Sequence, residues 1–330
     1  MSGGSIVILG AGAWGTALAV TLSRAGREVT LCPHRAEQAA ALERERENRG
    51  YLPGIELPPN LRINPRWEPE VAVAKLIIVA IPSQFVRACL TPLGALFAPD
   101  AIVVSATKGL EEHTLGTMTQ TLAEILPSSA AVAALSGPGF AVEIARGKPA
   151  ALVAAARDPA CVRMVQRLLA QPLLRIYRSS DVIGVELGGA LKNVIAIAAG
   201  IGDGLALGLS ARAAVITRGL AEMIRLGNAL GARTETLAGL SGLGDLVLTC
   251  TSELSRNHAW GLAIGAGRLP RLAPGQVAEG VVNTRLLAEL GARAGVELPL
   301  VEAVGRCLYE EQPPRTIVEN LLSRELKAEF

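Results

Sequence analysis

The chain has 330 residues, which is more than a single hydrophobic core usually holds, so two packed domains are expected. Half of its residues are hydrophobic, and the mean hydropathy is +0.37, but the apolar residues are spread over many short runs typical of buried strands and helices. The net charge of +2 includes no basic block, so we expect no nucleic-acid partner, and the five cysteines are scattered without metal-ligand spacing, so we expect no metal site. The amino terminus shows no secretory signal, so we expect a cytoplasmic protein without an integral membrane segment.

Short apolar runs alternate with helical stretches through the first half of the chain. Continuous hydrophobicity in such runs is typical of strands in a parallel sheet that helices cover on both faces. The pattern therefore predicts an α/β domain of the Rossmann type. The predicted strands are residues 6–9, 29–31, 76–81, 101–105, 131–135 and 150–154, with a last strand at 173–177.

The character of the sequence changes after Glu186, where the chain becomes rich in Gly, Ala and Leu at helical spacing and strand signals fade. We place a domain boundary near Leu187. This divides the chain into a dinucleotide-binding domain, residues 1–187, and an all-helical, substrate-binding domain, residues 188–330. A segment with two prolines and a glycine, residues 269–276, is expected to interrupt the helical domain.

A glycine motif follows the first predicted strand and opens a helix predicted at residues 14–25. Gly10, Gly12 and Gly15 have the spacing of the dinucleotide fingerprint, in which glycines allow a tight turn, close approach of the pyrophosphate and close packing of helix on strand. The helix N-terminus then offers free N–H groups to the phosphates. The motif predicts a bound nicotinamide dinucleotide; a tight turn without a ligand is the alternative.

The second predicted strand ends about twenty residues beyond the glycines, where NAD enzymes commonly carry an acidic residue for the ribose hydroxyls. Here the chain has His34 and Arg35 instead. A cation at this place can bind a ribose 2′-phosphate, so NADP(H) is favoured and NAD(H) remains possible. The alternative is that both residues form a solvated helix start.

Lys192 is the candidate proton donor for a dehydrogenase. It is the only ionisable residue between Glu186 and Asp203, in a segment whose period predicts a buried helix. Burial disfavours the charged form of an amine and lowers its pKa towards the range useful for acid–base catalysis. The alternative is a lysine whose stem follows the helix and whose ammonium reaches water.

Two further charged residues stand in settings typical of a site. Lys108 follows the strand predicted at 101–105, at the carboxyl edge of the sheet where doubly wound folds bind ligands. Asp245 lies alone in an apolar, glycine-rich stretch, and the glycine-containing segment 136–140 follows another strand end. For Lys108 the alternative is an ordinary surface lysine in a turn.

Ser255, Arg256 and Asn257 offer a hydroxyl, a guanidinium and an amide in succession. These groups suit a phosphate monoester, because a guanidinium binds phosphate through paired, charge-assisted hydrogen bonds. An ordinary helix cap or turn is the alternative.

These stretches resemble the bacterial type of NAD(P)-dependent glycerol-3-phosphate dehydrogenase, and they occur in that family's order over almost the whole chain. The resemblance implies reversible reduction of dihydroxyacetone phosphate to sn-glycerol 3-phosphate for phospholipid synthesis, and a homodimer. The matching segments are GAGAWGTALA from Gly10, SATKGLE from Ser105, SGPGFAVEIA from Ser136, ELGGALKNVIAIAAGIGDGL from Glu186, LSGLGDLVLTCTSELSRN from Leu240 and VAEGVVNT from Val277.

The resemblance also implies roles for individual residues. Lys192 would donate or accept the proton, with Lys108 and Asp245 as further catalytic residues, while Gly139 stands where many relatives have Ser or Thr. The substrate-binding residues would be Lys108, Gly137, Gly139, Lys192, Asp245, Ser255, Arg256 and Asn257. The cofactor-binding residues would be Gly10, Gly12, Ala13, Trp14, Gly15, His34, Arg35, Lys108, Ala141, Arg256, Val277 and Glu279.

Two other functions remain open from the sequence. A β-hydroxyacid or 6-phosphogluconate-type dehydrogenase also joins a Rossmann domain to a helical one and predicts a carboxylate substrate. A non-catalytic dinucleotide sensor would keep the nucleotide fold but would not need Lys108, Lys192 and Asp245 together.

Overall fold

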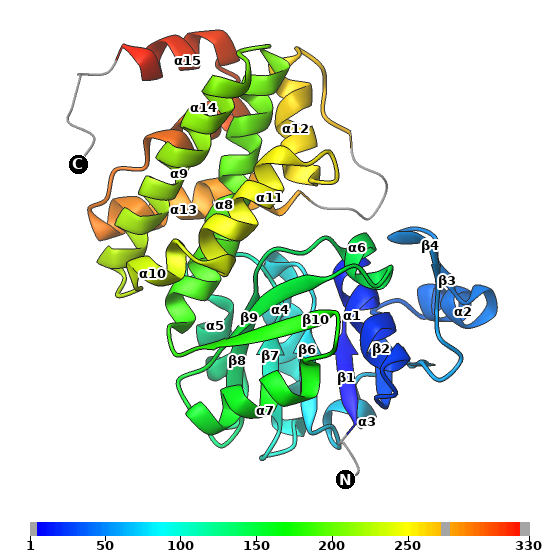
Figure 1. Cartoon of the computed structure of the whole chain (residues 1–330). Coiled ribbons are helices and arrows are strands. Elements are labelled where there is room, and N and C mark those ends of the chain that lie inside the picture. Colours follow the sequence, from blue (N-terminus) through cyan, green and yellow to red (C-terminus); the bar gives the residue numbers. More distant parts are fainter. Residues whose placement is uncertain (1–4, 272–277, 324–330) are drawn as a thin grey trace.

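The computed structural model describes residues 5–271 and 278–323, in which an α/β part precedes a group of helices (Figure 1). Eight strands form one sheet in the order β10-β9-β8-β7-β6-β1-β2-β5. They are β1 (Ile6–Leu9), β2 (Val29–Cys32), β5 (Arg62–Ile63), β6 (Leu76–Val79), β7 (Ile102–Ser105), β8 (Ala131–Ser136), β9 (Ala150–Ala155) and β10 (Leu174–Ser179). All seven predicted strands are therefore present.

The sheet differs from the prediction in direction and in extent. Strand β9 runs antiparallel to β8, and β10 is parallel to β9, so the sheet is mostly but not wholly parallel. The segment between β8 and β9 holds only the short helix α6 (Ala141–Ala145), which packs on α1 (Ala13–Arg24). A parallel pair needs a crossover connection that returns the chain to the starting edge of the sheet, and because this segment has none, β9 pairs antiparallel with β8. Strand β5 and a separate antiparallel pair, β3 (Glu47–Asn48) and β4 (Leu52–Glu56), were not predicted from the sequence.

The core of the α/β part lies on both faces of the sheet. In β1, Ile6 and Ile8 pack into one apolar cluster, whereas Val7 and Leu9 pack into the cluster on the opposite face. Burial on both faces explains the continuous apolar runs in the sequence. The other helical elements of this part are α2 (Ala36–Glu45), α3 (Glu68–Val71), α4 (Ser83–Leu90), η1 (Thr91–Leu96), α5 (Met118–Ile125) and α7 (Pro159–Leu169).

The helical part is arranged around α8 (Val182–Gly204), which is long and apolar enough to cross a membrane. Most of α8 is buried against the rest of the protein, so it is a core helix (Figure 1). Around it lie α9 (Leu209–Ala229), α10 (Thr234–Leu237), η2 (Leu240–Gly244), α11 (Asp245–Thr251), α12 (Arg256–Gly265), α13 (Glu279–Ala294), α14 (Pro299–Tyr309) and α15 (Pro314–Leu322).

Helix α8 also contacts the α/β part. Its first turns lie beside β8, and Glu186 accepts hydrogen bonds from the backbone N–H and the hydroxyl of Thr119 in α5 (2.8 and 2.5 Å). The boundary that we predicted at Leu187 falls within this stretch, and the two-domain division stays a prediction. Most of the predicted interruption, residues 269–276, lies outside the described residues.

Helices α8 and α12 approach each other closely because glycines face the contact. A Cβ on Gly200 would lie 2.1 Å from the carbonyl oxygen of His258, and one on Gly261 would lie 2.0 Å from that of Ile197. Only glycine fits at such distances. The close contact brings the N-terminus of α12 to the middle of α8, where Lys192 lies.

Candidate active site

The glycine turn between β1 and α1 combines tight packing with one open position. A Cβ on Gly10 (φ +107°) would meet the carbonyl oxygen of Ala80 at 2.5 Å, and one on Gly15 would meet that of Gly10 at 2.0 Å. A Cβ on Gly12 would have no neighbour within 4 Å. Gly12 is also the N-cap of α1 and gives no side-chain cap, so this open helix start fits a dinucleotide pyrophosphate.

His34 and Arg35 follow β2 and are both exposed. The ring of His34 makes an edge contact with Trp67, and Arg35 is the N-cap of α2. Gln38 of the same helix donates a hydrogen bond to the carbonyl oxygen of Ala11 (2.8 Å), so the start of α2 lies beside the glycine turn. Both side chains therefore lie at the edge of the predicted dinucleotide site.

A buried cluster of charges joins three segments that are far apart in the sequence. The Nζ of Lys192 donates to Oδ1 of Asp245 (2.5 Å) and to the hydroxyl of Thr249 (3.0 Å). The Nζ of Lys108 donates to the other oxygen of Asp245 (2.7 Å) and to the carbonyl oxygen of Gly137 (3.2 Å). Two of the residues predicted to be catalytic, Lys192 and Lys108, thus share the carboxylate of the third, Asp245.

Burial determines the electrostatics of this cluster. Lys192 is only 6% exposed and Asp245 only 1%, so the ammonium of Lys192 does not reach water along its helix. Burial lowers the pKa of Lys192 to about 8, with the charge of Lys108 acting in the same direction and Asp245 opposing both. A proton on this amine is therefore exchangeable in the neutral to mildly alkaline range.

Local structure explains why these groups meet. Asp245 begins α11, directly after the π-helical turn η2, and Thr249 lies four residues later on the same face. A Cβ on Gly189 would approach the Cγ of Lys108 to 3.3 Å, so this glycine lets the lysine stem cross α8. Thr249 was not predicted from the sequence, although its spacing of four residues from Asp245 could have identified it.

The predicted phosphate cradle lies at the start of α12 but is only partly free. The hydroxyl of Ser255 accepts from the N–H of His258 (3.2 Å), so this residue is the helix cap that we had considered as the alternative. The amide of Asn257 donates to Oδ1 of Asn193 (2.9 Å) and accepts from the N–H of Gly280 (3.0 Å). Arg256 is exposed and forms no side-chain hydrogen bond or ion pair within residues 5–271 and 278–323.

The remaining predicted residues lie around the same cluster. Gly137 (φ +130°) binds Lys108 through its carbonyl, and the Lys108 ammonium lies 5.8 Å from the centre of the Trp14 ring. Gly139 packs tightly, because a Cβ there would lie 2.8 Å from the side chain of Ile144.

Two predicted cofactor residues begin helices. Ala141 is the first residue of α6, and Glu279 is the first residue of α13. Burial raises the pKa of Glu279, while the cations Arg256, Lys108 and Lys192 act in the opposite direction. Glu279 therefore lies within electrostatic reach of the cluster, whereas Val277 lies outside the described residues.

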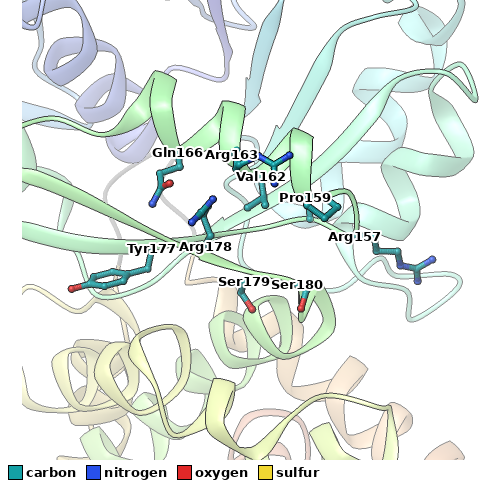
Figure 2. A pocket seen from close by; sticks show the side chains of 10 residues that line it. Arg157, Pro159, Val162, Arg163, Gln166, Tyr177, Arg178, Ser179 and Ser180 are labelled. Atoms are coloured by element: carbon teal, nitrogen blue, oxygen red, sulfur yellow. The ribbon is translucent and has the colours of Figure 1, made fainter.

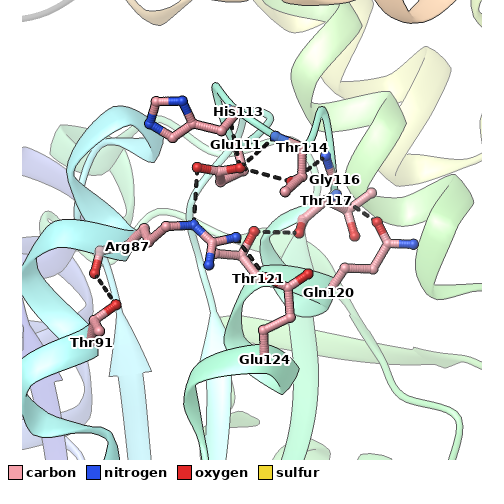
Figure 3. A network of polar contacts seen from close by, with 10 residues as sticks. All are labelled: Arg87, Thr91, Glu111, His113, Thr114, Gly116, Thr117, Gln120, Thr121 and Glu124. Carbon is pink, nitrogen blue, oxygen red and sulfur yellow. Dashed lines mark hydrogen bonds and ion pairs between the residues drawn. The ribbon is translucent and has the colours of Figure 1, made fainter. Parts of the chain in front are cut away.

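The loop that carries Lys108 is fixed by a polar network around Glu111 (Figure 3). Glu111 accepts from the hydroxyl and the N–H of Thr114 (2.7 and 2.8 Å), from the N–H of His113 and from Arg87 (3.1 Å each). Burial alone would raise the pKa of Glu111, but these donors lower it to about 2. The carboxylate is therefore ionised at neutral pH and anchors the loop.

Two hollows on the surface of the described residues bear on the location of the site. The larger, 470 Å³, lies between α7 and β10 and is bordered by Arg157, Arg163 and Arg178 (Figure 2); none of its lining residues was predicted to be in the site. The smaller, 230 Å³, is bordered by Gly139 and by Leu248 of α11. The buried charge cluster, rather than the larger hollow, therefore marks the candidate active site.

The arrangement has the elements that hydride transfer to a ketone requires. An open helix start suits a dinucleotide, an exposed guanidinium suits an anionic substrate, and a buried amine with a lowered pKa can exchange a proton with a carbonyl oxygen. Trp14 and Lys108 connect the glycine turn to the cluster. The candidate site is thus continuous from the sheet edge to α8.

Comparison with known proteins agrees with this chemistry. Two family models match the chain: NAD-dependent glycerol-3-phosphate dehydrogenase N-terminus over residues 5–162, and its C-terminus over residues 181–319. Curated proteins from Geobacter sulfurreducens and Rhodopseudomonas palustris, both called glycerol-3-phosphate dehydrogenase [NAD(P)+], are 48% and 45% identical, each alignment covering 98% of both chains.

A solved structure gives the same result. The crystal structure of glycerol-3-phosphate dehydrogenase from Coxiella burnetii is 38% identical, with a TM-score of 0.94, and the match covers 98% of this chain and all of that one. The chain therefore belongs to the NAD-dependent glycerol-3-phosphate dehydrogenase family and is an oxidoreductase.

Proposed function

We propose that the protein catalyses the reversible reduction of dihydroxyacetone phosphate to sn-glycerol 3-phosphate, with Lys192 as the proton donor. The observation that carries this proposal is the buried Lys192–Asp245–Lys108 cluster beside the glycine turn. A reduced nicotinamide bound along the glycine turn would supply the hydride for the carbonyl carbon. Lys192 gives its proton to the carbonyl oxygen, and in the reverse reaction the neutral amine takes it back.

The other members of the cluster hold the groups in place. Asp245 orients both ammonium groups, and the hydroxyl of Thr249, on the same face of α11, accepts a second hydrogen bond from the Nζ of Lys192. Lys108 offers a second positive charge close to Trp14, on the side of the cofactor. Charge that develops on the substrate oxygen would then meet two preorganised cations in a site with little water.

The phosphate would be bound at the start of α12. Arg256 has a guanidinium without a protein partner among the described residues, and the first turn of the helix adds backbone N–H groups. Asn257 retains one amide hydrogen beyond its bond to Asn193, and Ser255 retains its hydroxyl hydrogen. The backbone at Gly137 and Gly139 completes the proposed substrate site.

The cofactor would be bound along the glycine turn. We propose that NADP(H) is preferred and NAD(H) is also accepted, because His34 and Arg35 replace the acidic residue that favours NAD. The residues involved would be Gly10, Gly12, Ala13, Trp14, Gly15, Ala141 and Glu279. We further propose a cytoplasmic homodimer that supplies glycerophospholipid synthesis, as expected from the resemblance.

A steady-state assay tests the substrate. We expect oxidation of NADPH with dihydroxyacetone phosphate, slower oxidation of NADH, and very little turnover with unphosphorylated dihydroxyacetone. Replacing Arg256 by Ala removes a charge-assisted contact of about 1.5–3 kcal/mol, so KM for dihydroxyacetone phosphate should rise roughly 10- to 100-fold. A preference for keto acids, or an equal effect of the substitution on unphosphorylated substrate, would contradict the proposal.

A further inference from the structure

Asn283 joins the helical part of the protein to the loop that carries Lys108. It lies on α13, one turn after Glu279, and is completely buried. Its Oδ1 accepts a hydrogen bond from the N–H of Leu110 (3.1 Å), and its Nδ2 donates one to the carbonyl oxygen of Lys108 (3.3 Å). One amide side chain therefore binds the backbone on both sides of Gly109.

The contact is close and depends on the amide group. A Cβ on Gly109 would lie 2.5 Å from the hydroxyl of Ser83 and 3.0 Å from Nδ2 of Asn283, so the loop is confined between α4 and α13. An amide is needed because one backbone partner is a donor and the other is an acceptor. Losing the bond to Leu110 would leave a buried backbone N–H unsatisfied, and losing the other would free the backbone carbonyl of Lys108.

We propose that Asn283 is a positioning residue that sets the backbone of Lys108 so that its ammonium reaches Asp245. The inference rests on the proposed function, in which Lys108 and Lys192 act on the substrate and the carboxylate of Asp245 orients both of their ammonium groups. Lys108 is held at both ends: Asn283 binds its backbone carbonyl, and Asp245 and Gly137 bind its Nζ. Helix α13 thereby holds a catalytic residue from more than 170 positions away in the sequence.

Displacing Lys108 would have a specific electrostatic consequence. The groups bound to or nearest the amine of Lys192 are Asp245 and Thr249 of α11 and the ammonium of Lys108, and Cys250 of α11 and Glu279 of α13 also lie within electrostatic reach. Lys108 holds the pKa of Lys192 down, so moving it away would let that pKa rise. The pH dependence of turnover would then shift to higher pH, which a general loss of stability would not produce.

The test begins with Asn283→Asp, which keeps the shape of the side chain but replaces the donor to Lys108 by a carboxylate oxygen. Because the added negative charge itself raises the pKa of Lys192, the shift of the pH profile is read in the uncharged variant Gly109→Ala. We expect kcat for dihydroxyacetone phosphate to fall roughly 10- to 100-fold, as for residues that orient a catalytic group, with NADPH affinity unchanged. The matched control is Thr284→Val. Thr284 is equally buried on the same helix, and its hydroxyl donates to Gly280 within that helix, so the control should keep kcat within about twofold.

A double-mutant cycle with Lys108→Ala shows whether Asn283 acts through Lys108. If it does, Asn283→Asp causes no further loss of kcat in the Lys108→Ala enzyme. Full additivity of the two losses, or an Asn283→Asp enzyme with normal turnover and an unshifted pH profile, would overturn the inference. Normal turnover of Lys108→Ala alone would instead contradict the role of Lys108 in the proposed function.

A second variant is needed in case Asn283→Asp does not fold. Gly109→Ala displaces the same loop in another way, because the added Cβ would meet the side chains of Ser83 and Asn283. The amide of Asn283 itself is unchanged. We expect the same direction of change in kcat and in the pH profile, and again no further effect in the Lys108→Ala background. An additive effect of Gly109→Ala would count against the inference.

Discussion

The two halves of the candidate site are built in different ways. At the sheet edge, the stretch from Gly10 to Gly15 has no ionisable residue, and its fit to a dinucleotide comes from backbone shape and an open helix start. At α8, Lys108, Lys192 and Asp245 form a charged cluster buried among apolar helices. Binding thus depends mainly on space, whereas proton transfer depends on charges removed from water.

The largest effect should follow from removing the proton donor in the charged half. Lys192→Ala should lower kcat by about two to four orders of magnitude, because general acid catalysis is lost. NADPH should still bind, since the glycine turn is untouched, and fluorescence titration with steady-state kinetics would measure both. Lys75→Ala, which changes an exposed lysine paired with Asp100, is the control that should leave turnover unchanged.

The two kinds of glycine in the other half should respond oppositely to an added methyl group. Gly15→Ala places a Cβ 2.0 Å from the carbonyl oxygen of Gly10, so the packing of α1 on β1 must shift, at a cost of about 1–3 kcal/mol in the free energy of unfolding. Gly12→Ala has free space in the protein and should fold normally but bind NADPH about tenfold more weakly. Denaturant unfolding and NADPH titration of each variant separate the two effects. Equal stability of both variants would contradict this distinction.

A smaller effect concerns a buried charge that the proposed mechanism does not use. Burial raises the pKa of Glu222 to about 7, although the N–H groups of Leu300 and Val301 and the charge of Arg225 oppose the shift. The pKa of Glu222 in the folded protein exceeds its ordinary value of about 4.5. The contribution of this carboxyl to the free energy of unfolding is therefore greatest below pH 4.5 and is lost as pH rises through 7. The loss should approach about 3 kcal/mol.

Glu222→Gln removes this titration. Unfolding free energies measured at pH 5 and pH 8 should therefore differ less in the variant than in the unchanged protein. Identical pH dependence in the two proteins would show that the buried carboxyl does not titrate in this range.

The sequence predicted the local features of the fold well. The seven apolar runs and the glycine turn are each set by neighbouring residues, so they could be located before the structure was known. The antiparallel direction of β9 depends on where α6 packs, and strands of two residues such as β3 and β5 are too short to show a pattern. Those features are determined by contacts between distant segments.

The candidate site could be located in the sequence where an unusual residue marked it. Lys192 and Asp245 stood out as single charges in apolar stretches, and the structure places them in contact. The hydrogen bonds of Asn257 to Asn193 and of Asn283 to the Lys108 loop join segments 64 and 175 positions apart, so no local signal could reveal them. Ser255 could be identified as either a ligand or a helix cap, and only the geometry shows the cap.

The most direct test of the central claim is the pH dependence of kcat in both directions of the reaction. With the pKa of Lys192 near 8, reduction of dihydroxyacetone phosphate should slow as pH rises above 8, and oxidation of glycerol 3-phosphate should accelerate through the same range. The residual activity of Lys192→Ala should lack this transition. A flat profile in the unchanged enzyme, or the same transition in Lys192→Ala, would contradict the account.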